Sequence, residues 1–175
     1  LTADQYYFGR HMAKLAALIQ YTLPGCPSLY YGDEAGVCGF TDPDNRRTYP
    51  WGREDHDLIQ FHRDMIRIHR ENRELCTGSL KYIDQDYNVI GYGRFNRRQA
   101  TVVLVNNNDY ETLRSVCVWT LGIPKSCVLK RLMLTTAEGY SVAARTYPVE
   151  DGLIQISLPP TSAVVLKYEN SSATT

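Results

Sequence analysis

The 175-residue sequence has no excess of charge of either sign. Lys and Arg together number 19, Asp and Glu also number 19, and the formal net charge at pH 7 is zero. This balance gives no electrostatic reason to expect nucleic acid or an anionic membrane as a partner. No apolar run approaches the roughly 20 residues of a membrane-spanning helix. No charged-then-apolar leader opens the chain, so we expect no signal peptide.

Cysteine is scarce and irregularly spaced. The five cysteines are Cys26, Cys38, Cys76, Cys117 and Cys127, and none belongs to a Cys-x-x-Cys pair. A zinc site is therefore not expected. Free thiols in a reducing compartment are the simplest interpretation, which favours a cytoplasmic location. A bridge between Cys117 and Cys127 on neighbouring strands stays open as an alternative.

The motifs of several common catalytic sites are also missing. The sequence contains no Gly-x-Ser-x-Gly elbow, no glycine loop for phosphate and no His-Glu-x-x-His helix. Asp33 and Glu34 are adjacent carboxylates, and on an extended strand they would point to opposite faces and could not flank one bond. We therefore expect no catalytic residue, no cofactor and no metal site in this chain.

The first helix is predicted from Thr2 to about Tyr21. Thr2 and Gln5 form a plausible capping box, and Pro24 ends the helix. His11 is expected to be solvated or at an edge. The predicted apolar stripe consists of Phe8, Met12, Leu15, Ala16 and Ile19.

A second helix is predicted from Asp55 to Asn72, with acidic residues at its positive end. His62 and His69 lie seven residues apart and are expected to be packing or edge residues. The buried stripe is predicted to be Leu58, Phe61, Met65 and Ile68.

From Gly78 onward the apolar period changes from helical to alternating, which predicts an antiparallel β-sandwich. Ala100 to Val105 is apolar almost throughout, as in a central strand covered on both faces. The predicted strands are Ser79–Ile83, Val89–Phe95, Ala100–Asn106, Leu113–Thr120, Val128–Leu134, Leu153–Leu158 and Ala163–Tyr168.

Between the helices lies the stretch Pro24 to Trp51, around which the site is predicted. Ser28 to Tyr31 reads as a short strand, and a loop rich in turn residues follows it. Asp42 and Arg46 could form an ion pair that shapes this loop, or could bind sugar hydroxyls. Both can hold, because an arginine fixed by a carboxylate is a preorganised donor.

This stretch resembles the end of the catalytic domain in the alpha-amylase family of glycoside hydrolases. The matching residues are Tyr30-Tyr31-Gly32-Asp33-Glu34, then Asp42-Pro43-Asp44-Asn45-Arg46-Arg47, then Trp51. Their spacing is most like the cyclomaltodextrinase, neopullulanase and maltogenic amylase group. The β half is similar to the small domain that follows the barrel in that family. It ends in a Leu-Pro-Pro turn and an aliphatic strand, as Leu158 to Lys167 does here.

The resemblance implies an α+β fold. Residues 1–76 would be the end of a (β/α)8 barrel, comprising its last strand and two helices. Residues 77–169 would be an antiparallel β-sandwich, and residues 170–175 a disordered tail. The first helix would be barrel helix seven, and Ser28 to Tyr31 barrel strand eight.

The resemblance also implies the C-terminal part of a glycosidase that hydrolyses α-1,4-glucosidic bonds in cyclodextrins, maltooligosaccharides or starch. Asp42 and Arg46 would bind substrate. The residues expected to support the site are Tyr31, Asp33, Glu34 and Trp51. The family's catalytic carboxylates belong to earlier barrel strands, so this part would be inactive alone.

Two alternatives stay open. The sandwich could be a carbohydrate-binding module, because its half of the chain is rich in tyrosine (Tyr82, Tyr87, Tyr92, Tyr110, Tyr140, Tyr147 and Tyr168). It could also be a purely structural domain. A barrel remnant would leave helix stripes and sheet edges bare in about the first 75 residues. We therefore expect these residues to dimerise, to be sheltered by another chain such as the missing barrel portion, or to be partly disordered.

Overall fold

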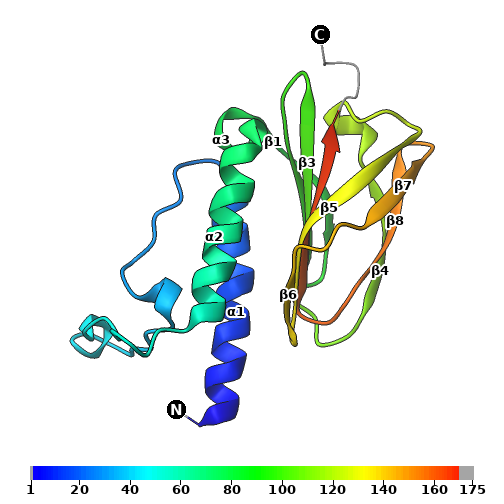
Figure 1. Ribbon diagram of the computed structural model, residues 1–175. Helices are drawn as coiled ribbons and strands as arrows, with labels where there is room; N and C mark the ends of the chain where they lie inside the picture. Colours follow the sequence, from blue (N-terminus) through cyan, green and yellow to red (C-terminus); the bar gives the residue numbers. More distant parts are fainter. Residues whose placement is uncertain (1, 170–175) are drawn as a thin grey trace.

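The computed structural model describes residues 2–169, which form helices on one side and a β-sandwich on the other (Figure 1). Helix α1 spans Ala3–Thr22, α2 His56–Glu71 and α3 Arg73–Thr77. Three single 3-10 turns are η1 Asp33–Ala35, η2 Asp44–Arg46 and η3 Trp119–Leu121. The strands are β1 Ser79–Asp86, β2 Val89–Phe95, β3 Gln99–Asn106, β4 Thr112–Cys117, β5 Cys127–Thr136, β6 Gly139–Ser141, β7 Thr146–Glu150, β8 Leu153–Leu158 and β9 Ser162–Glu169.

Both long helices begin at the predicted caps. The Thr2 hydroxyl accepts the Gln5 N–H, and the Gln5 side chain accepts the Thr2 N–H, so the capping box of α1 is confirmed. The Asp55 carboxylate accepts the N–H groups of Asp57 and Leu58 at the start of α2. These bonds satisfy backbone donors that have no partner within their own helix.

All paired strands run antiparallel, as predicted. Their order is β1-β2-β3-β9-β5-β7-β8-β4, and β6 pairs with β5. The predicted strand Leu113–Thr120 is too long, because β4 ends at Cys117 and the η3 turn follows. Strands β6 and β7 were not predicted, and Pro148 within β7 is a residue that argues against a strand in sequence.

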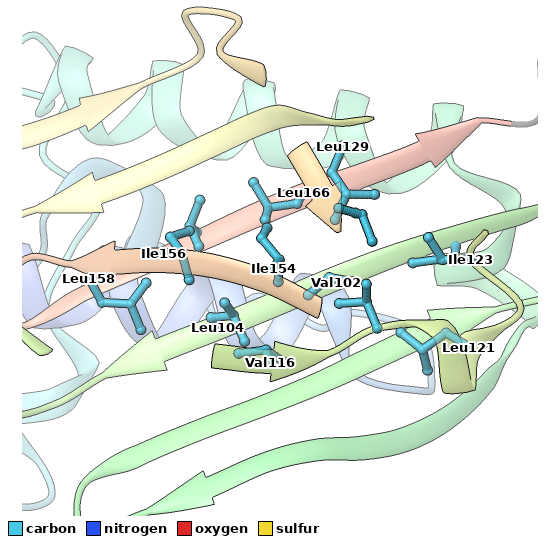
Figure 2. Packing of buried hydrophobic residues seen from close by; sticks show 14 of the residues in the cluster. Val102, Leu104, Val116, Leu121, Ile123, Leu129, Ile154, Ile156, Leu158 and Leu166 are labelled. Atoms are coloured by element: carbon cyan, nitrogen blue, oxygen red, sulfur yellow. The ribbon is translucent and has the colours of Figure 1, made fainter. Parts of the chain in front are cut away.

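Side chains of β3 alternate between two apolar cores. Val102 and Leu104 face the interior of the sandwich, where Ile154 and Ile156 of β8 approach them from the opposite layer (Figure 2). Each of these four side chains is at most 4% exposed. The prediction that this strand is covered on both faces is confirmed by the second core described next.

The second core joins the sheet to the helices. Val103 and Val105 of β3 point away from the sandwich interior and belong to the same cluster as Leu18, Phe61 and Met65. The predicted stripe of α2 is confirmed, since Leu58, Phe61, Met65 and Ile68 are at most 2% exposed. The expectation of bare helix stripes is wrong for most of this stripe, because Phe61, Met65 and Ile68 pack in one core with the chain's own sheet.

The predicted stripe of α1 is confirmed only in part, since Leu15 is buried and Ile19 packs against the second core. Phe8 is 65% exposed, whereas Leu18 and Tyr21 are buried. His11 is also buried, contrary to the expectation of a solvated position, and so is Lys14. Lys14 tolerates burial because its ammonium group pairs with Asp57 of α2 and lies 5.1 Å from the ring centre of Tyr140. The buried face of α1 therefore differs from the predicted one, because contacts with residues distant in sequence determine it.

Ser28 to Tyr31 does not form a strand. Residues 28–30 have no regular secondary structure, Tyr31 lies in a turn, and the segment has no ladder partner among the described residues. The boundary predicted between residues 76 and 77 stays a prediction. The predicted disordered tail, residues 170–175, lies outside the described residues.

All five cysteines are free thiols, so no bridge joins Cys117 to Cys127. Among the described helices, none combines the length and the apolarity required to cross a bilayer.

Candidate site in the loop between the first two helices

The segment from Gly32 to Glu54 leaves the helices through a tight turn. Gly32 and Gly36 have φ values of 91° and 76°, in the left-handed region that favours glycine. They flank η1, which contains Asp33 and Glu34. These two carboxylates therefore occupy a 3-10 turn and not the extended strand that was predicted for them.

Asp33 and Glu34 have different surroundings in this turn. One carboxylate oxygen of Glu34 accepts the Gly32 N–H at 3.0 Å, so Glu34 closes its own turn. Burial and the nearby negative charge of Glu34 raise the pKa of Asp33. Glu34 thus stabilises its own turn, and its role in supporting a site stays a prediction.

The predicted binding pair lies at the outer part of the loop. The Asp42 carboxylate accepts from Arg46 Nε at 2.9 Å and from Arg46 Nη2 at 3.1 Å. The Asp42 and Arg46 side chains are 60% and 67% exposed. An arginine has five N–H donors, so three of them on Arg46 stay available for a ligand.

A second ion pair shapes the same loop. The Asp44 carboxylate accepts from Arg47 at 2.8 to 3.0 Å and also accepts the Phe40 N–H at 3.0 Å. The Arg47 carbonyl accepts from the Tyr31 hydroxyl at 3.0 Å. Tyr31 therefore links the start of the loop to its outer turn, and its role in supporting a site stays a prediction.

Three aromatic residues help to line a hollow in the segment between the first two helices. The rings of Tyr30 and Tyr31 have centroids 4.8 Å apart. The hollow has a volume of about 320 Å³ and is lined by Tyr30, Tyr31, Asp33, Val37, Gly39, Phe40 and Asn45. Of the predicted residues it contains Tyr31 and Asp33. Asp42, Glu34, Arg46 and Trp51 do not line it.

The Trp51 ring pairs with Tyr49 in a tilted arrangement, rather than with the Tyr30–Tyr31 pair. The two ring centroids are 4.6 Å apart, and Trp51 is 81% exposed. Exposed aromatic faces of this kind suit stacking on the apolar face of a sugar ring. The structure thus places the predicted residues on one loop, but it brings only part of them to one hollow.

A cluster at the base of the loop was not identified from the sequence. The Asp55 carboxylate accepts from the Tyr6 hydroxyl at 3.0 Å and pairs with Arg10 at 2.5 Å. Burial raises the pKa of Asp55, but the Leu58 N–H, Arg10 and Tyr6 together outweigh it, and the pKa lies below its ordinary value. The sequence predicted only the capping role of Asp55, because its partners on α1 lie more than 40 residues away in the chain.

A larger hollow of about 640 Å³ lies between α1 and the loop. Asp33 and His62 line it together with small residues of α1 such as Ala13 and Ala16. His62 Nδ1 lies 3.1 Å from the Tyr21 hydroxyl, and burial lowers the pKa of His62. His62 is therefore a packed residue, as predicted.

The tyrosines of the β half differ widely in exposure. Tyr92 is 1% exposed and its hydroxyl lies 2.6 Å from the Thr22 hydroxyl, so it has no surface for a sugar. Tyr82, Tyr87 and Tyr110 are 59%, 77% and 56% exposed. Tyr82 lies opposite Tyr92 in the β1–β2 ladder.

Within residues 2–169, no three His, Cys, Asp or Glu side chains gather closely enough to hold a metal ion. The loop instead offers guanidinium donors, carboxylate acceptors and aromatic faces. Such groups can bind a neutral ligand rich in hydroxyl groups.

Comparison with known proteins gives a consistent set of relatives, although no family model matches. An amylopullulanase from Thermoanaerobacter thermohydrosulfuricus is 36% identical over 164 residues, covering 87% of this chain and 10% of that protein. A cyclomaltodextrinase from Thermoanaerobacter pseudethanolicus is 37% identical over 98 residues, covering 55% of this chain and 17% of that protein.

The fold is also found in solved structures. The alpha-amylase from Geobacillus thermoleovorans, crystallised with acarbose, superposes with a TM-score of 0.79 and 22% sequence identity. The match covers 93% of this chain and 34% of that chain. This chain thus spans about a tenth to a third of the proteins that it resembles.

Proposed function

Because this chain belongs to the alpha-amylase family of glycoside hydrolases, we propose that it is the C-terminal part of an enzyme acting on α-1,4-glucans. The substrates would be cyclodextrins, maltooligosaccharides or starch. In this proposal, the chain supplies residues that bind the glucan, and the carboxylates that cleave it belong to another part of the enzyme.

The observation that carries the proposal is the Asp42–Arg46 pair. A carboxylate fixes the guanidinium through two contacts while both side chains stay more than half exposed. An arginine fixed in this way loses little conformational freedom when it donates to a sugar hydroxyl. The exposed rings of Tyr31 and Trp51 on the same loop add apolar faces for the sugar.

A direct test is the affinity of the chain for maltotriose by isothermal titration calorimetry. Replacement Arg46→Gln removes the charged donor and should weaken binding at least about tenfold, the value of a charge-assisted hydrogen bond. Arg53→Gln is the matched control, an exposed arginine of the same loop that should leave affinity unchanged. Equal affinity of wild type and Arg46→Gln would refute the role of Arg46.

The proposal that the chain does not cleave glucans is tested separately. Retaining hydrolysis needs two carboxyl groups about 5 Å apart across the bond, and Glu34 is bonded to the Gly32 N–H within its own turn. Incubation of the pure chain with maltooligosaccharides or cyclodextrin should release no shorter product. Turnover that disappears in Glu34→Gln would show that this part is catalytic.

Binding by the sandwich is the competing function. Its best probe is the exposed Tyr82, because Tyr92 is buried. If maltotriose affinity falls in Tyr82→Ala and not in Trp51→Ala, the sugar site lies on the sandwich. No binding by the wild-type chain would favour a structural domain.

The remaining partners are proposals as well. The hollow between α1 and the loop would be covered by another part of the same enzyme or by a second copy of the chain. A concentration-dependent mass in sedimentation would favour the second copy. A cytoplasmic location remains part of the proposal, and fractionation of the source cells would test it.

A further inference from the structure

The loop Gly32–Glu54 returns to the helices at the point where it left them. The Asp55 N–H donates to the Ala35 carbonyl at 3.0 Å, so the first residue after the loop is bonded to the turn at its start. The Asp55 carboxylate also accepts the Leu58 N–H at 3.0 Å, which fixes it to α2. This pair of bonds closes the base of the loop.

Two side chains of α1 complete this closure. The Tyr6 hydroxyl donates to Asp55 at 3.0 Å, and Arg10 Nη2 donates to the other carboxylate oxygen of Asp55 at 2.8 Å. The same Arg10 atom lies 2.6 Å from Asp57. We call Tyr6, Arg10 and Asp55 the loop clamp, since they join α1, α2 and the loop.

The clamp is more buried than the ion pairs within the loop. The Asp55 side chain is 10% exposed and that of Arg10 is 23% exposed. In contrast, the side chains of the Asp44–Arg47 pair are 44% and 55% exposed. Exposed pairs are screened by water and contribute little, whereas a partly buried pair with several donors fixes geometry more strongly.

The backbone of the loop lies directly against the clamp. A Cβ atom added to Gly36 would be 3.0 Å from the Tyr6 hydroxyl oxygen and 3.1 Å from Asp55 Cβ. Glycine at this position therefore allows the close approach, and its φ of 76° adds a second requirement for glycine.

We propose that Tyr6 and Arg10 are positioning residues for the glucan-binding loop and act on it through Asp55. This inference rests on the proposed function. Neither residue is among those predicted to bind the sugar. Removing either contact does not alter the side chains of Asp42, Arg46 and Trp51. It makes the loop that carries them more mobile. Loss of preorganisation then weakens the binding of a glucan.

The test uses the full chain and two variants that remove single contacts. Arg10→Met keeps the length of the side chain without its charge, and Tyr6→Phe removes only the hydroxyl. Maltotriose affinity should fall about three- to tenfold in Arg10→Met, the range typical of lost preorganisation. Arg10→Lys should recover part of it, since lysine restores one charged contact. Arg98→Met, on the β2–β3 turn, is the matched control.

Amide hydrogen exchange supplies the second readout. Amides of residues 33–55 should exchange faster in both variants, while those of β3 and β9 stay unchanged. Unchanged loop exchange, or faster exchange with unchanged affinity, would overturn the positioning role. If exchange also rises in β3 and β9 of Arg10→Met, the effect of that variant is not confined to the loop. The positioning role is then decided by the Tyr6→Phe variant. If the wild-type chain binds no maltotriose, the proposed function fails, and the exchange data alone decide whether the clamp fixes the loop.

Discussion

The carboxylate of Glu74 lies 2.5 Å from the ammonium nitrogen of Lys167, and both side chains are buried between α3 and the sheet. The Thr101 hydroxyl donates to the same carboxylate oxygen. Glu74 belongs to the helical part and Lys167 to the last strand. The interface between them is therefore specified by a charge pair as well as by apolar packing.

Replacement Lys167→Met should lower the free energy of unfolding by about 3 kcal/mol, because it leaves the Glu74 charge buried without its cation. Urea denaturation followed by circular dichroism measures the change. The double variant Glu74→Leu/Lys167→Met should recover most of the loss, since no charge then stays buried. As a control, Arg47→Met disrupts the exposed pair with Asp44 and should cost less than about 1 kcal/mol. A similar cost for both single variants would contradict this account.

Unfolding of a Phe61 variant shows whether the helices and the sandwich unfold together. Its ring is fully buried between α2 and the sheet, with its centroid 5.2 Å from that of Tyr140. Phe61→Ala should cost about 3–5 kcal/mol, as for other large core truncations. Helical circular dichroism and Trp119 fluorescence, measured in a Trp51→Phe background, should report one transition. Two separate transitions would show that the sandwich folds independently of the helices.

The sequence predicted most of the secondary structure because the local patterns were strong. The stripe of α2 and the alternation in β3 depend on neighbours within a few residues, and both were correctly predicted. The stripe of α1 was predicted only in part, because the burial of Lys14 depends on Asp57 and Tyr140. Those partners lie 43 and 126 positions further along the chain, and helical periodicity contains no information on them.

The same holds for the candidate site: its local features were predicted from the sequence, and its contacts between distant segments were not. The motif resemblance identified the loop and the Asp42–Arg46 pair, whose contact at i and i+4 is local. The clamp formed by Tyr6, Arg10 and Asp55 requires the packing of α1 against α2, which no local pattern specifies. Ser28–Tyr31 has strand composition but no ladder partner here, because pairing is a property of two segments and not of one.

We expect the stability of the chain to depend on pH through the buried side chain of His62. Burial lowers its pKa below the ordinary value of 6.5, although Glu34 and Asp33 act in the opposite direction. The unfolded chain therefore binds the proton at a higher pH than the folded chain does. The contribution of His62 to stability is complete above pH 6.5 and is lost as the pH falls toward the folded pKa.

In His62→Gln the fall in stability between pH 7 and pH 5.5 should be smaller, by at most about 1.4 kcal/mol per pH unit. Glutamine can still bond to the Tyr21 hydroxyl and does not titrate. Urea unfolding at several pH values measures the slope. His69→Gln is the comparison, since His69 Nδ1 lies 2.7 Å from the backbone carbonyl of the same Tyr21. An unchanged slope in His62→Gln would assign the pH dependence to other groups.

Arg114 connects the two ends of the strand order. It lies on β4, and its guanidinium contacts Asp84 of β1 at 2.6 and 2.8 Å and Asp86 of β1 at 2.5 Å. The carboxylates of Asp84 and Asp86 raise the pKa of Arg114 above its ordinary value, while burial acts in the opposite direction. Strands β1 and β4 are the edges of the sheet, so this contact brings two unpaired edges together.

Arg114→Met should therefore have two effects. The free energy of unfolding should fall by about 2–3 kcal/mol, because Asp84, only 10% exposed, loses its cation. The separated edges should also pair with other molecules, since exposed strand edges are templates for association. Urea unfolding measures the first effect, and light scattering against concentration measures the second. The double variant Arg114→Met/Asp84→Asn should regain stability and still associate, because it removes the unpaired charge without closing the edges. If it regains stability and stays monomeric, the association arises from the buried charge and not from the open edges.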